Sequence, residues 1–231
     1  MAKSKRGSLK KKPLSICVLL LLIVSGYHYE EIEQFINDNI IEIKEEKKDT
    51  PVISYDISKI PSYSGEPYVI IDDNIPNFTE EDYRKDSFEI YSELDSLGRC
   101  GVAFANIGKE LMPTEERGSI GMIKPSGWQT VKYDIVDGKY LYNRCHLIGY
   151  QLTGENANPK NLITCTRYMN TVGMLEFENK VATYIKETGN HVLYRVTPIF
   201  DSDNLLALGV EMEAYSIEDR GEGIKFHIFV Y

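Results

Sequence analysis

The chain has 231 residues, of which 42% are hydrophobic, and it carries a formal net charge of −9 at pH 7. This length and apolar content suffice for one substantial core, and the sequence contains no repeat array. The isoelectric point near 5.1 argues against a dedicated high-affinity nucleic-acid binder, because phosphate contacts supply most non-specific affinity. It does not exclude an enzyme, which must also release its product. Cationic side chains outnumber acidic ones only in residues 1–27 and 96–200.

The first 60 residues have the patterns of a targeting segment and a linker. Six of the first twelve residues are Lys or Arg, and an apolar run from Leu14 to Gly26 follows. This is the pattern of a secretion signal, although the run is short for a membrane span of about 20 residues. We therefore predict a cleaved signal peptide or an uncleaved signal anchor over 1–27, which would place the rest of the chain outside the cytoplasmic membrane. Residues 28–60 predict an acidic amphipathic helix and a solvated linker.

The remaining residues, 61–231, are predicted to form one domain. Residues 68–71 indicate a strand. Thr79 has the character of a helix N-cap with acidic residues in the first turn, so a helix is predicted over Thr79–Ser92. A strand over 100–107 and a loop at 113–118 complete this part of the chain.

Three cations, Arg117, Lys124 and Lys132, lie close in sequence to Trp128. They are candidates for phosphate contacts. The simpler interpretation of each one singly is a solvated side chain, which is the usual fate of scattered surface cations. Trp128 is interpreted as a core residue rather than a base-stacking platform.

A polar cluster, Asn143-Arg144-Cys145-His146, interrupts an otherwise apolar strand that runs from Gly138 to Tyr150. Successive side chains of a strand point to opposite faces, so Arg144 and His146 share one face while Asn143 and Cys145 share the other. A cation is therefore expected beside an imidazole. The same alternation disfavours a thiol nucleophile made from Cys145 and His146.

A second polar cluster, residues 156–161, holds three asparagines around a proline and predicts a turn. The apolar run 162–164 and a helix over 166–188 follow it. On that helix Asn170 and Glu178 lie among apolar residues at three- and four-residue spacing. Buried polar groups need partners, and a hydrated metal ion would satisfy an amide oxygen and a carboxylate together. The alternative is that Glu178 reaches solvent at the edge of the stripe.

Three further strands are predicted over 191–200, 205–217 and 224–231, joined by short polar turns that would complete an antiparallel sheet. Arg195 lies within the first of them and must face either solvent or a site.

Three cysteines, Cys100, Cys145 and Cys165, follow the secretion segment. They permit at most one internal disulfide and leave one thiol over. A zinc site built from them with His146 lacks any C-x-x-C pairing.

Taken together, the order N-R-C-H, then N-P-K-N, then a helix bearing Asn and Glu resembles the DNA/RNA non-specific endonucleases of the ββα-metal, or His-Me finger, class. More closely, it looks like the DNA-entry and secreted nucleases of Gram-positive bacteria. The resemblance runs from about Leu97 to the C-terminus, and it implies an α+β fold with an antiparallel sheet and a ββα-metal motif. The family signature is D-R-G-H, so Asn143 and Cys145 depart from it. The missing carboxylate at residue 143 bears on the pKa of His146 and on metal binding.

The resemblance also implies roles for individual residues. His146 matches the general base, Asn161 the metal ligand, and Asn170 and Glu178 the supporting polar residues that steady the ion's waters. The metal is expected to be Mg²⁺, with Mn²⁺ as an alternative. The side chains expected to contact substrate phosphate are Arg144, Arg167 and Arg195. Arg144 is further expected to stabilise the developing negative charge, which makes it a candidate catalytic residue beside His146 and Glu178.

These expectations predict metal-assisted hydrolysis of phosphodiester bonds in DNA and RNA with little base specificity. Nucleic acid would be the substrate, and the membrane a partner only through an uncleaved N-terminal segment. Two other functions remain open at this point. One is a catalytically inactive surface receptor for nucleic acid, and the other is a phosphodiesterase acting on small nucleotides.

Overall fold

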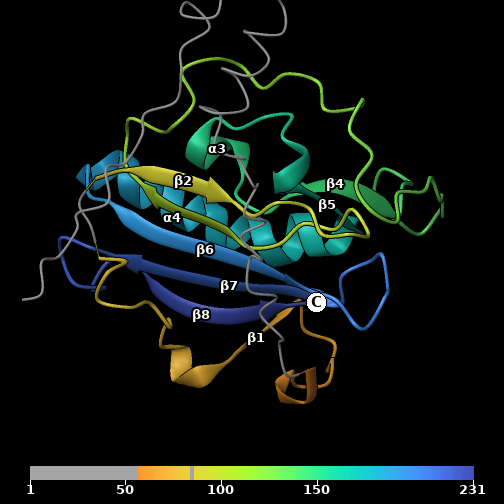
Figure 1. Cartoon of the computed structure of the whole chain (residues 1–231), viewed down its shortest axis with the longest axis horizontal. Helices are drawn as coiled ribbons and strands as arrows, with labels where there is room; N and C mark the ends of the chain where they lie inside the picture. The colour runs from red at the N-terminus through yellow and green to blue at the C-terminus, as the bar shows by residue number, and fades with distance from the viewer. Residues whose placement is uncertain (1–56, 84–85) are drawn as a thin grey trace, which may run out of the picture. The chain divides into compact units, whose positions relative to one another are not determined.

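An antiparallel sheet of six strands organises the computed structural model, which describes residues 57–83 and 86–231 (Figure 1). The spatial order is β1-β8-β7-β6-β3-β2, and every neighbouring pair is antiparallel. The strands are β1 (Tyr68–Ile70), β2 (Phe88–Tyr91), β3 (Ala103–Ile107), β6 (Val192–Ile199), β7 (Gly209–Ser216) and β8 (Lys225–Val230). The predicted α+β class and antiparallel sheet are confirmed.

A separate two-stranded antiparallel sheet pairs β4 (Tyr142–His146) with β5 (Leu162–Thr166). Short helices lie between and around these strands: α3 (Tyr150–Thr153), η3 (Pro159–Asn161), η1 (Ile57–Lys59) and η2 (Asp72–Asn74). The chain then enters a π-helical segment, η4 (Met169–Met174), which continues into α4 (Leu175–Thr188). Two strands followed by a helix make the ββα arrangement that the sequence predicted.

Helix α4 covers one face of the six-stranded sheet and lies behind β6 in Figure 1. Phe177, Val181 and Ile185 recur every four residues and are buried, so they form the apolar stripe of an amphipathic helix. Burying each such side chain contributes about 1.5–3 kcal/mol. Phe177 meets Phe226 of β8 at a ring-centroid distance of 4.9 Å. The helix ends at Gly189, whose left-handed backbone (φ 76°) lets its N–H reach the Ile185 carbonyl.

The other face of the sheet is crossed by residues 71–83, which we call the strap. Phe78 of the strap stacks on Phe104 of β3, with ring centroids 5.8 Å apart. Backbone hydrogen bonds join Ile71 N–H to the His227 carbonyl at 3.1 Å. The sheet is therefore covered on both faces, by α4 on one and by the strap on the other.

The predicted helix over Thr79–Ser92 is wrong. Residues 88–91 form strand β2, which pairs with β3, and Thr79 instead closes a local turn through hydrogen bonds to the Asp82 carboxylate. Aromatic and β-branched side chains at Phe88, Ile90 and Tyr91 favour a strand, and pairing with β3 overrides the N-cap pattern.

The other predicted elements of residues 61–231 are present with shifted ends, and the predicted 166–188 helix begins as the π segment. The segment 1–27 and nearly all of 28–60 lie outside the described residues. None of the helices in the described part of the chain is long and apolar enough to cross a membrane.

Candidate active site

The end of β4 is held in place by Asn161. Its side-chain oxygen accepts from Ile148 N–H and its amide donates to the Ile148 carbonyl, both at 2.9 Å. Its backbone carbonyl accepts from Leu147 N–H at 2.9 Å. The side chain is completely buried. Asn161 therefore fixes the backbone directly after His146, a structural task that the sequence did not reveal.

His146 occupies the last position of β4 and is buried. Nε2 lies 2.7 Å from the Asn156 carbonyl, and a carbonyl only accepts hydrogen bonds, so the proton of the neutral ring sits on Nε2. Nδ1 is then the basic nitrogen, and Arg117 donates to it at 3.4 Å. Burial lowers the pKa of His146 and the Arg117 charge adds to this, while the Asn156 hydrogen bond opposes both. The imidazole is thus neutral near pH 7, and its basic nitrogen is Nδ1, whose lone pair faces the Arg117 guanidinium across a long contact of 3.4 Å.

Glu178 of α4 reaches the same region. A Cβ on Gly149 would lie 2.7 Å from its Oε1, so the carboxyl packs directly against that glycine. Burial raises the pKa of Glu178 to about 7, and the charge of Arg117 opposes the shift. Arg117, which we had interpreted as a solvated cation, is therefore electrostatically coupled to both His146 and Glu178.

Tyr194 of β6 adds a second polar group on this side of the sheet. The side chain is fully buried, and its hydroxyl has no hydrogen-bond partner within the described residues. Burial raises the pKa of Tyr194, and the nearby Glu178 charge raises it further. A buried hydroxyl without a partner normally marks a place where water or a ligand completes the hydrogen bonding.

Asn170 lies in the π-helical segment and is half-buried. Its side-chain amide makes no hydrogen bond to any residue that the structure describes. It therefore differs from Asn161, whose amide oxygen and nitrogen are both engaged. Of the two predicted ligands, Asn170 is the one with a free amide oxygen.

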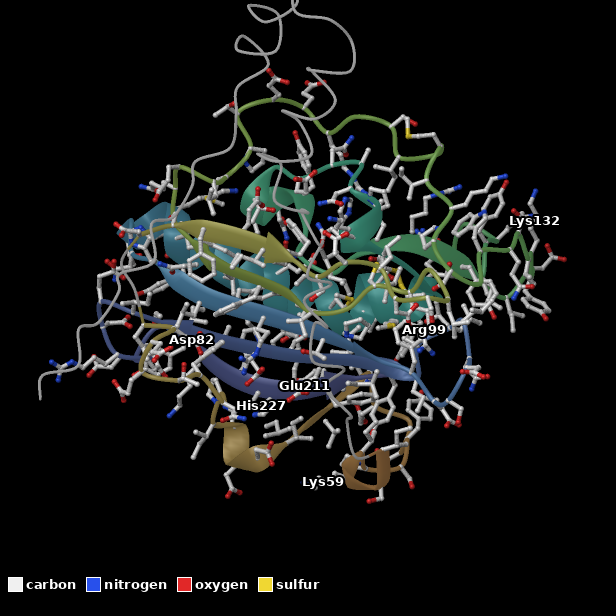
Figure 2. The ribbon with its side chains drawn as sticks, in the orientation of Figure 1. Lys59, Asp82, Arg99, Lys132, Glu211 and His227 are labelled. Carbon is white, nitrogen blue, oxygen red and sulfur yellow. A yellow bond between two sulfur atoms is a disulfide. The ribbon has the colours of Figure 1, made fainter. Side chains whose placement is uncertain are left out.

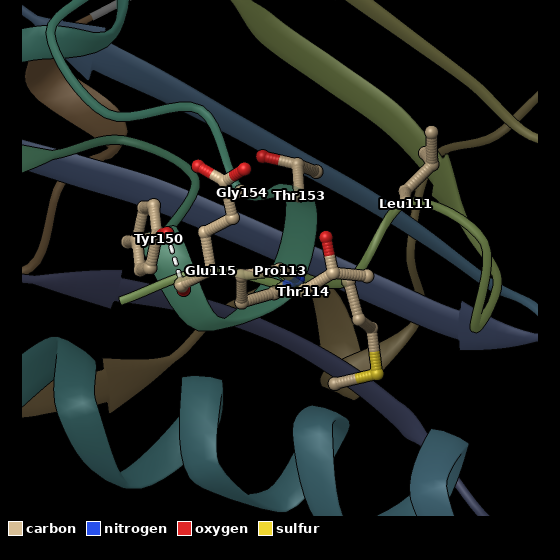
Figure 3. A pocket seen from close by; sticks show the side chains of 8 residues that line it. Leu111, Pro113, Thr114, Glu115, Tyr150, Thr153 and Gly154 are labelled. Atoms are coloured by element: carbon tan, nitrogen blue, oxygen red, sulfur yellow. Dashed lines mark hydrogen bonds between the residues drawn. The ribbon is translucent and has the colours of Figure 1, made fainter. Parts of the chain in front are cut away.

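The segment before Arg117 lines a shallow cavity of about 260 Å³ together with α3 (Figure 3). The Tyr150 hydroxyl of α3 donates to the Glu115 carbonyl at 2.7 Å. Gly154 ends α3 in the left-handed region (φ 67°), where the chain passes close to Pro113. These contacts hold residues 113–117 beside the turn that follows His146.

The three arginines predicted to contact phosphate lie in different places. Arg144 stacks on Trp128, 3.8 Å from the ring centroid, and donates to the Ile123 and Gly121 carbonyls. Arg167 is bound by the Asp137 carboxylate at 2.7 and 3.0 Å.

Arg195, the third of these arginines, lies across the sheet from Tyr194, on the face that the strap covers. It binds the Glu213 carboxylate and the Asn77 carbonyl. The structure thus does not bring Arg195 to His146.

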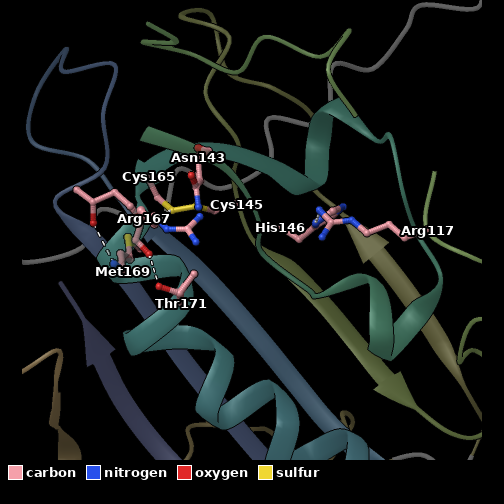
Figure 4. The surroundings of a disulfide bond; sticks show 9 residues. Arg117, Asn143, Cys145, His146, Cys165, Arg167, Met169 and Thr171 are labelled. Carbon is pink, nitrogen blue, oxygen red and sulfur yellow. Dashed lines mark hydrogen bonds between the residues drawn. A yellow bond between two sulfur atoms is a disulfide. The ribbon is translucent and has the colours of Figure 1, made fainter. Parts of the chain in front are cut away.

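A disulfide joins β4 to β5 through Cys145 and Cys165 (Figure 4). This fits the expectation of at most one internal bridge, and Cys100 is the free, buried cysteine among the described residues. Closing a loop of 20 residues stabilises the fold by about 3 kcal/mol in the chain-entropy account. Asn143 lies beside the disulfide, whereas His146 lies toward Arg117 (Figure 4).

A further set of potential metal ligands consists of Asp72 of the strap, Glu211 of β7 and His227 of β8. Figure 2 labels Glu211 and His227. His227 donates from Nδ1 to the Ile75 carbonyl at 2.8 Å and from Nε2 to Glu211. Both ring nitrogens therefore carry protons, and neither offers a lone pair to an ion. We assign this set to hydrogen bonding within the fold.

Comparison with known proteins identifies the family and similar folds. A profile of the DNA/RNA non-specific endonuclease family matches residues 77–218. Among solved structures, NucA from Streptococcus agalactiae without metal has 23% identity and a TM-score of 0.63, over 75% of this chain and 83% of NucA. Its magnesium-bound form has 22% identity and the same TM-score, over 73% and 80%.

The Sda1 nuclease with a bound zinc ion has 27% identity and a TM-score of 0.55, over 72% of this chain and 90% of Sda1. No match is found among curated proteins. The family profile covers more than half of the chain and includes β4, β5 and α4. The chain therefore belongs to the DNA/RNA non-specific endonuclease family and is a nuclease.

Proposed function

We propose that this nuclease is a metal-dependent endonuclease that hydrolyses phosphodiester bonds in DNA and RNA outside the cytoplasmic membrane. The observation that carries the proposal is the neutral imidazole of His146. Its Nε2–H is fixed on the Asn156 carbonyl, and Nδ1 is left as a base beside the Arg117 cation.

In the proposed reaction Nδ1 of His146 accepts a proton from water as that water attacks phosphorus. The P–O bond to the leaving nucleotide breaks, and a solvent water protonates the leaving oxygen. Asn156 holds the ring in one orientation before and after this transfer, because its carbonyl accepts from Nε2–H in both the neutral and the protonated imidazole. Arg117 stabilises negative charge that develops on the phosphate, and it also keeps His146 from being protonated beforehand.

The donor set fits a hard divalent cation. Asn170 offers an amide oxygen without a partner within the described residues, and the Glu178 carboxyl accepts no hydrogen bond from them. Mg²⁺ prefers such oxygen ligands and retains much of its water, so few direct protein ligands are needed. When bound, the ion would act as a Lewis acid toward the phosphate oxygens. We propose Asn170 as the direct ligand and Glu178 as the group that orients the ion's waters.

Asn161, the ligand expected from the sequence, is assigned a positioning role in this proposal. Its amide already satisfies both backbone groups of Ile148 and has no exposed surface. The identity of the ion is proposed from ligand chemistry: carboxylate and amide oxygens favour Mg²⁺ or Mn²⁺, whereas thiolate-rich or imidazole-rich sites favour zinc. The magnesium-bound NucA and the zinc-bound Sda1 show that similar folds accept both kinds of ion.

The proposed location rests on two features. The Cys145–Cys165 disulfide is of the kind that persists in oxidising compartments. The N-terminal residues have the pattern of a secretion signal, cleaved or retained as an anchor.

Plasmid and RNA cleavage by the full chain, with Mg²⁺ and with a chelator, tests the proposal. We expect nicking of supercoiled DNA and degradation of RNA that both stop when the metal is removed. Nucleic-acid binding without cleavage at any metal concentration would favour the inactive receptor instead. Hydrolysis confined to dinucleotides would favour a small-nucleotide phosphodiesterase.

A further inference from the structure

Residues 131–141 form a short hairpin that leads directly into β4, and its conformation is fixed by several bonds. Leu141 N–H donates to the Val131 carbonyl at 3.0 Å, and Tyr133 N–H donates to the Lys139 carbonyl at 2.9 Å. The hairpin is also attached to the end of β5. Arg167 N–H donates to the Leu141 carbonyl at 2.8 Å, and the Arg167 guanidinium binds Asp137.

The tip of this hairpin presents apolar surface to solvent. Ile135 is 96% exposed, and Tyr133 and Tyr140 are each about half exposed. Turn tips are normally polar, so an isoleucine held there by an ordered turn contributes nothing to the core. Single exposed apolar residues are common, but here three lie on one hairpin of eleven residues.

Cations accompany the apolar residues. Residues 117–147 contain five Lys or Arg side chains against two carboxylates, in a chain whose net charge is −9. Both carboxylates form ion pairs, Asp134 with Lys139 and Asp137 with Arg167. Lys132 lies 4.7 Å from the ring centroid of Tyr140. Aromatic rings beside cations are the means by which proteins hold single-stranded nucleic acid, through base stacking and phosphate attraction.

We propose that the 131–141 hairpin binds an unpaired nucleic-acid strand, with Tyr133 stacking on a base and Ile135 inserting between neighbouring bases, so that single-stranded or locally melted substrates are preferred. The inference rests on the proposed function and extends it to a substrate class. Lys132 and Arg144 would neutralise phosphates between the hairpin and His146.

The position of the hairpin sets a length for this interaction. At about 3.3 Å per residue, β4 from Tyr142 to His146 spans about 13 Å, and the hairpin precedes its start. At 3.4 Å per nucleotide, a stacked strand that reaches from the hairpin to His146 must be longer than about four nucleotides. Substrates of four nucleotides or fewer would bypass the hairpin.

Fluorescence anisotropy in a chelator, with labelled 20-nucleotide single strands and the matching duplex, measures this binding without turnover. The test variant of the full chain is Tyr133→Ala with Ile135→Ala. We expect single-strand affinity to fall about tenfold to hundredfold, since a stack is worth 1–3 kcal/mol per base, and duplex affinity to fall less than threefold. Tyr133→Phe should retain binding, because the ring remains. Ile75→Ala, which alters an isoleucine 61% exposed on the strap, should change neither affinity.

Equal losses for single strand and duplex, or no loss, would overturn the inference. So would an equal effect of Ile75→Ala, or loss of self-association or anionic-vesicle binding while oligonucleotide binding stays normal. Because binding is read in the chelator, an enzyme that fails to cleave DNA would overturn the proposed function and leave the hairpin test intact. With metal present, cleavage of a tetranucleotide should be insensitive to the double variant, whereas cleavage of the 20-nucleotide strand should slow.

Discussion

The two faces of the six-stranded sheet carry polar clusters that differ in how completely they are satisfied. On the strap face, Arg195, Glu213 and His227 occupy one row across three strands, and each finds partners in the sheet or the strap. On the α4 side, the Tyr194 hydroxyl has no partner in the described residues, and the Glu178 carboxyl accepts no hydrogen bond from them.

This difference in hydrogen bonding distinguishes polar groups that stabilise the fold from polar groups that are available for function. Buried polar groups that are fully paired hold a fold together, whereas incompletely paired ones are retained where a substrate, ion or water must enter. The same contrast holds for the two histidines. Burial lowers the pKa of both histidines. At His227 the carboxylates of Glu211 and Glu213 outweigh burial and raise the pKa above its ordinary value. At His146 the Arg117 charge lowers the pKa further.

The largest expected effect is that of His146→Ala, which should lower cleavage by about 10²–10⁴-fold because it removes the base. Thermal stability should fall by only about 1–3 kcal/mol, because the Asn156 carbonyl loses its donor, and DNA binding should change little. Single-turnover cleavage of a plasmid, with the melting temperature as control, checks this. Near-normal turnover in the purified variant would remove His146 from the mechanism.

The matched change on the strap face, His227→Ala, should give the opposite result. It leaves the Glu211 carboxylate and the Ile75 carbonyl without their donor, and breaking a buried pair costs about 3–5 kcal/mol. Cleavage per folded molecule should remain normal, as urea unfolding combined with activity measurements would show. Loss of activity without loss of stability would break the comparison between the two faces.

The raised pKa of His227 adds a pH dependence to this stability. A pKa that is higher in the folded than in the unfolded state stabilises the fold below the unfolded value near 6.5. That stability is lost as the pH rises through the folded pKa. The wild-type melting temperature should therefore decline above neutral pH more than that of the His227→Ala variant.

The next largest effects are expected from replacing Asn170 and Asn161. Asn170→Ala should lower the apparent metal affinity, read from the metal dependence of the rate, by on the order of 10–100-fold. Asn161→Ala should chiefly lower the free energy of unfolding, by about 1–3 kcal/mol for each backbone group left unpaired. This reverses the order that the sequence motif suggested. Metal titration against rate in both variants decides it, and a larger metal effect for Asn161→Ala would restore the original assignment.

A smaller effect is expected from Arg117→Gln. Removing the cation should raise the pKa of His146 and of Glu178, so the acidic limb of the rate profile should move to higher pH. The shift should be partial, because burial is the larger cause at His146. Arg117→Lys, which keeps the charge, serves as the control. A rate profile with an unmoved acidic limb would show that Arg117 and His146 are not coupled.

The smallest effect should come from Asn143→Asp, which restores the family's aspartate. A carboxylate there would raise the pKa of His146 and tighten metal binding. Asn143 lies beside the disulfide and away from His146, so the shift should be smaller than that of Arg117→Gln (Figure 4). Rate against pH at saturating Mg²⁺ separates the two contributions. A shift of the acidic limb to lower pH would contradict electrostatic coupling between residue 143 and His146.

The sequence by itself determined the elements whose patterns are local. Segments bounded by short polar turns predicted β6, β7 and β8, and three- and four-residue spacing indicated α4. The N-R-C-H and N-P-K-N motifs led to the family and to His146 as a candidate base. It mistook β2 for a helix because pairing with β3 is a non-local contact that outweighs a local N-cap pattern.

Only the tertiary structure decided how completely each polar group is partnered. Asn161 and Asn170 look alike in sequence, yet one amide is engaged by Ile148 and the other is free among the described residues. Arg117 and Arg195 were both isolated cations in the sequence, yet one lies beside His146 and the other across the sheet. The physical reason is that hydrogen bonds and charge coupling act over a few ångströms of space, and residues 13 to 29 positions apart are brought that close only by the fold.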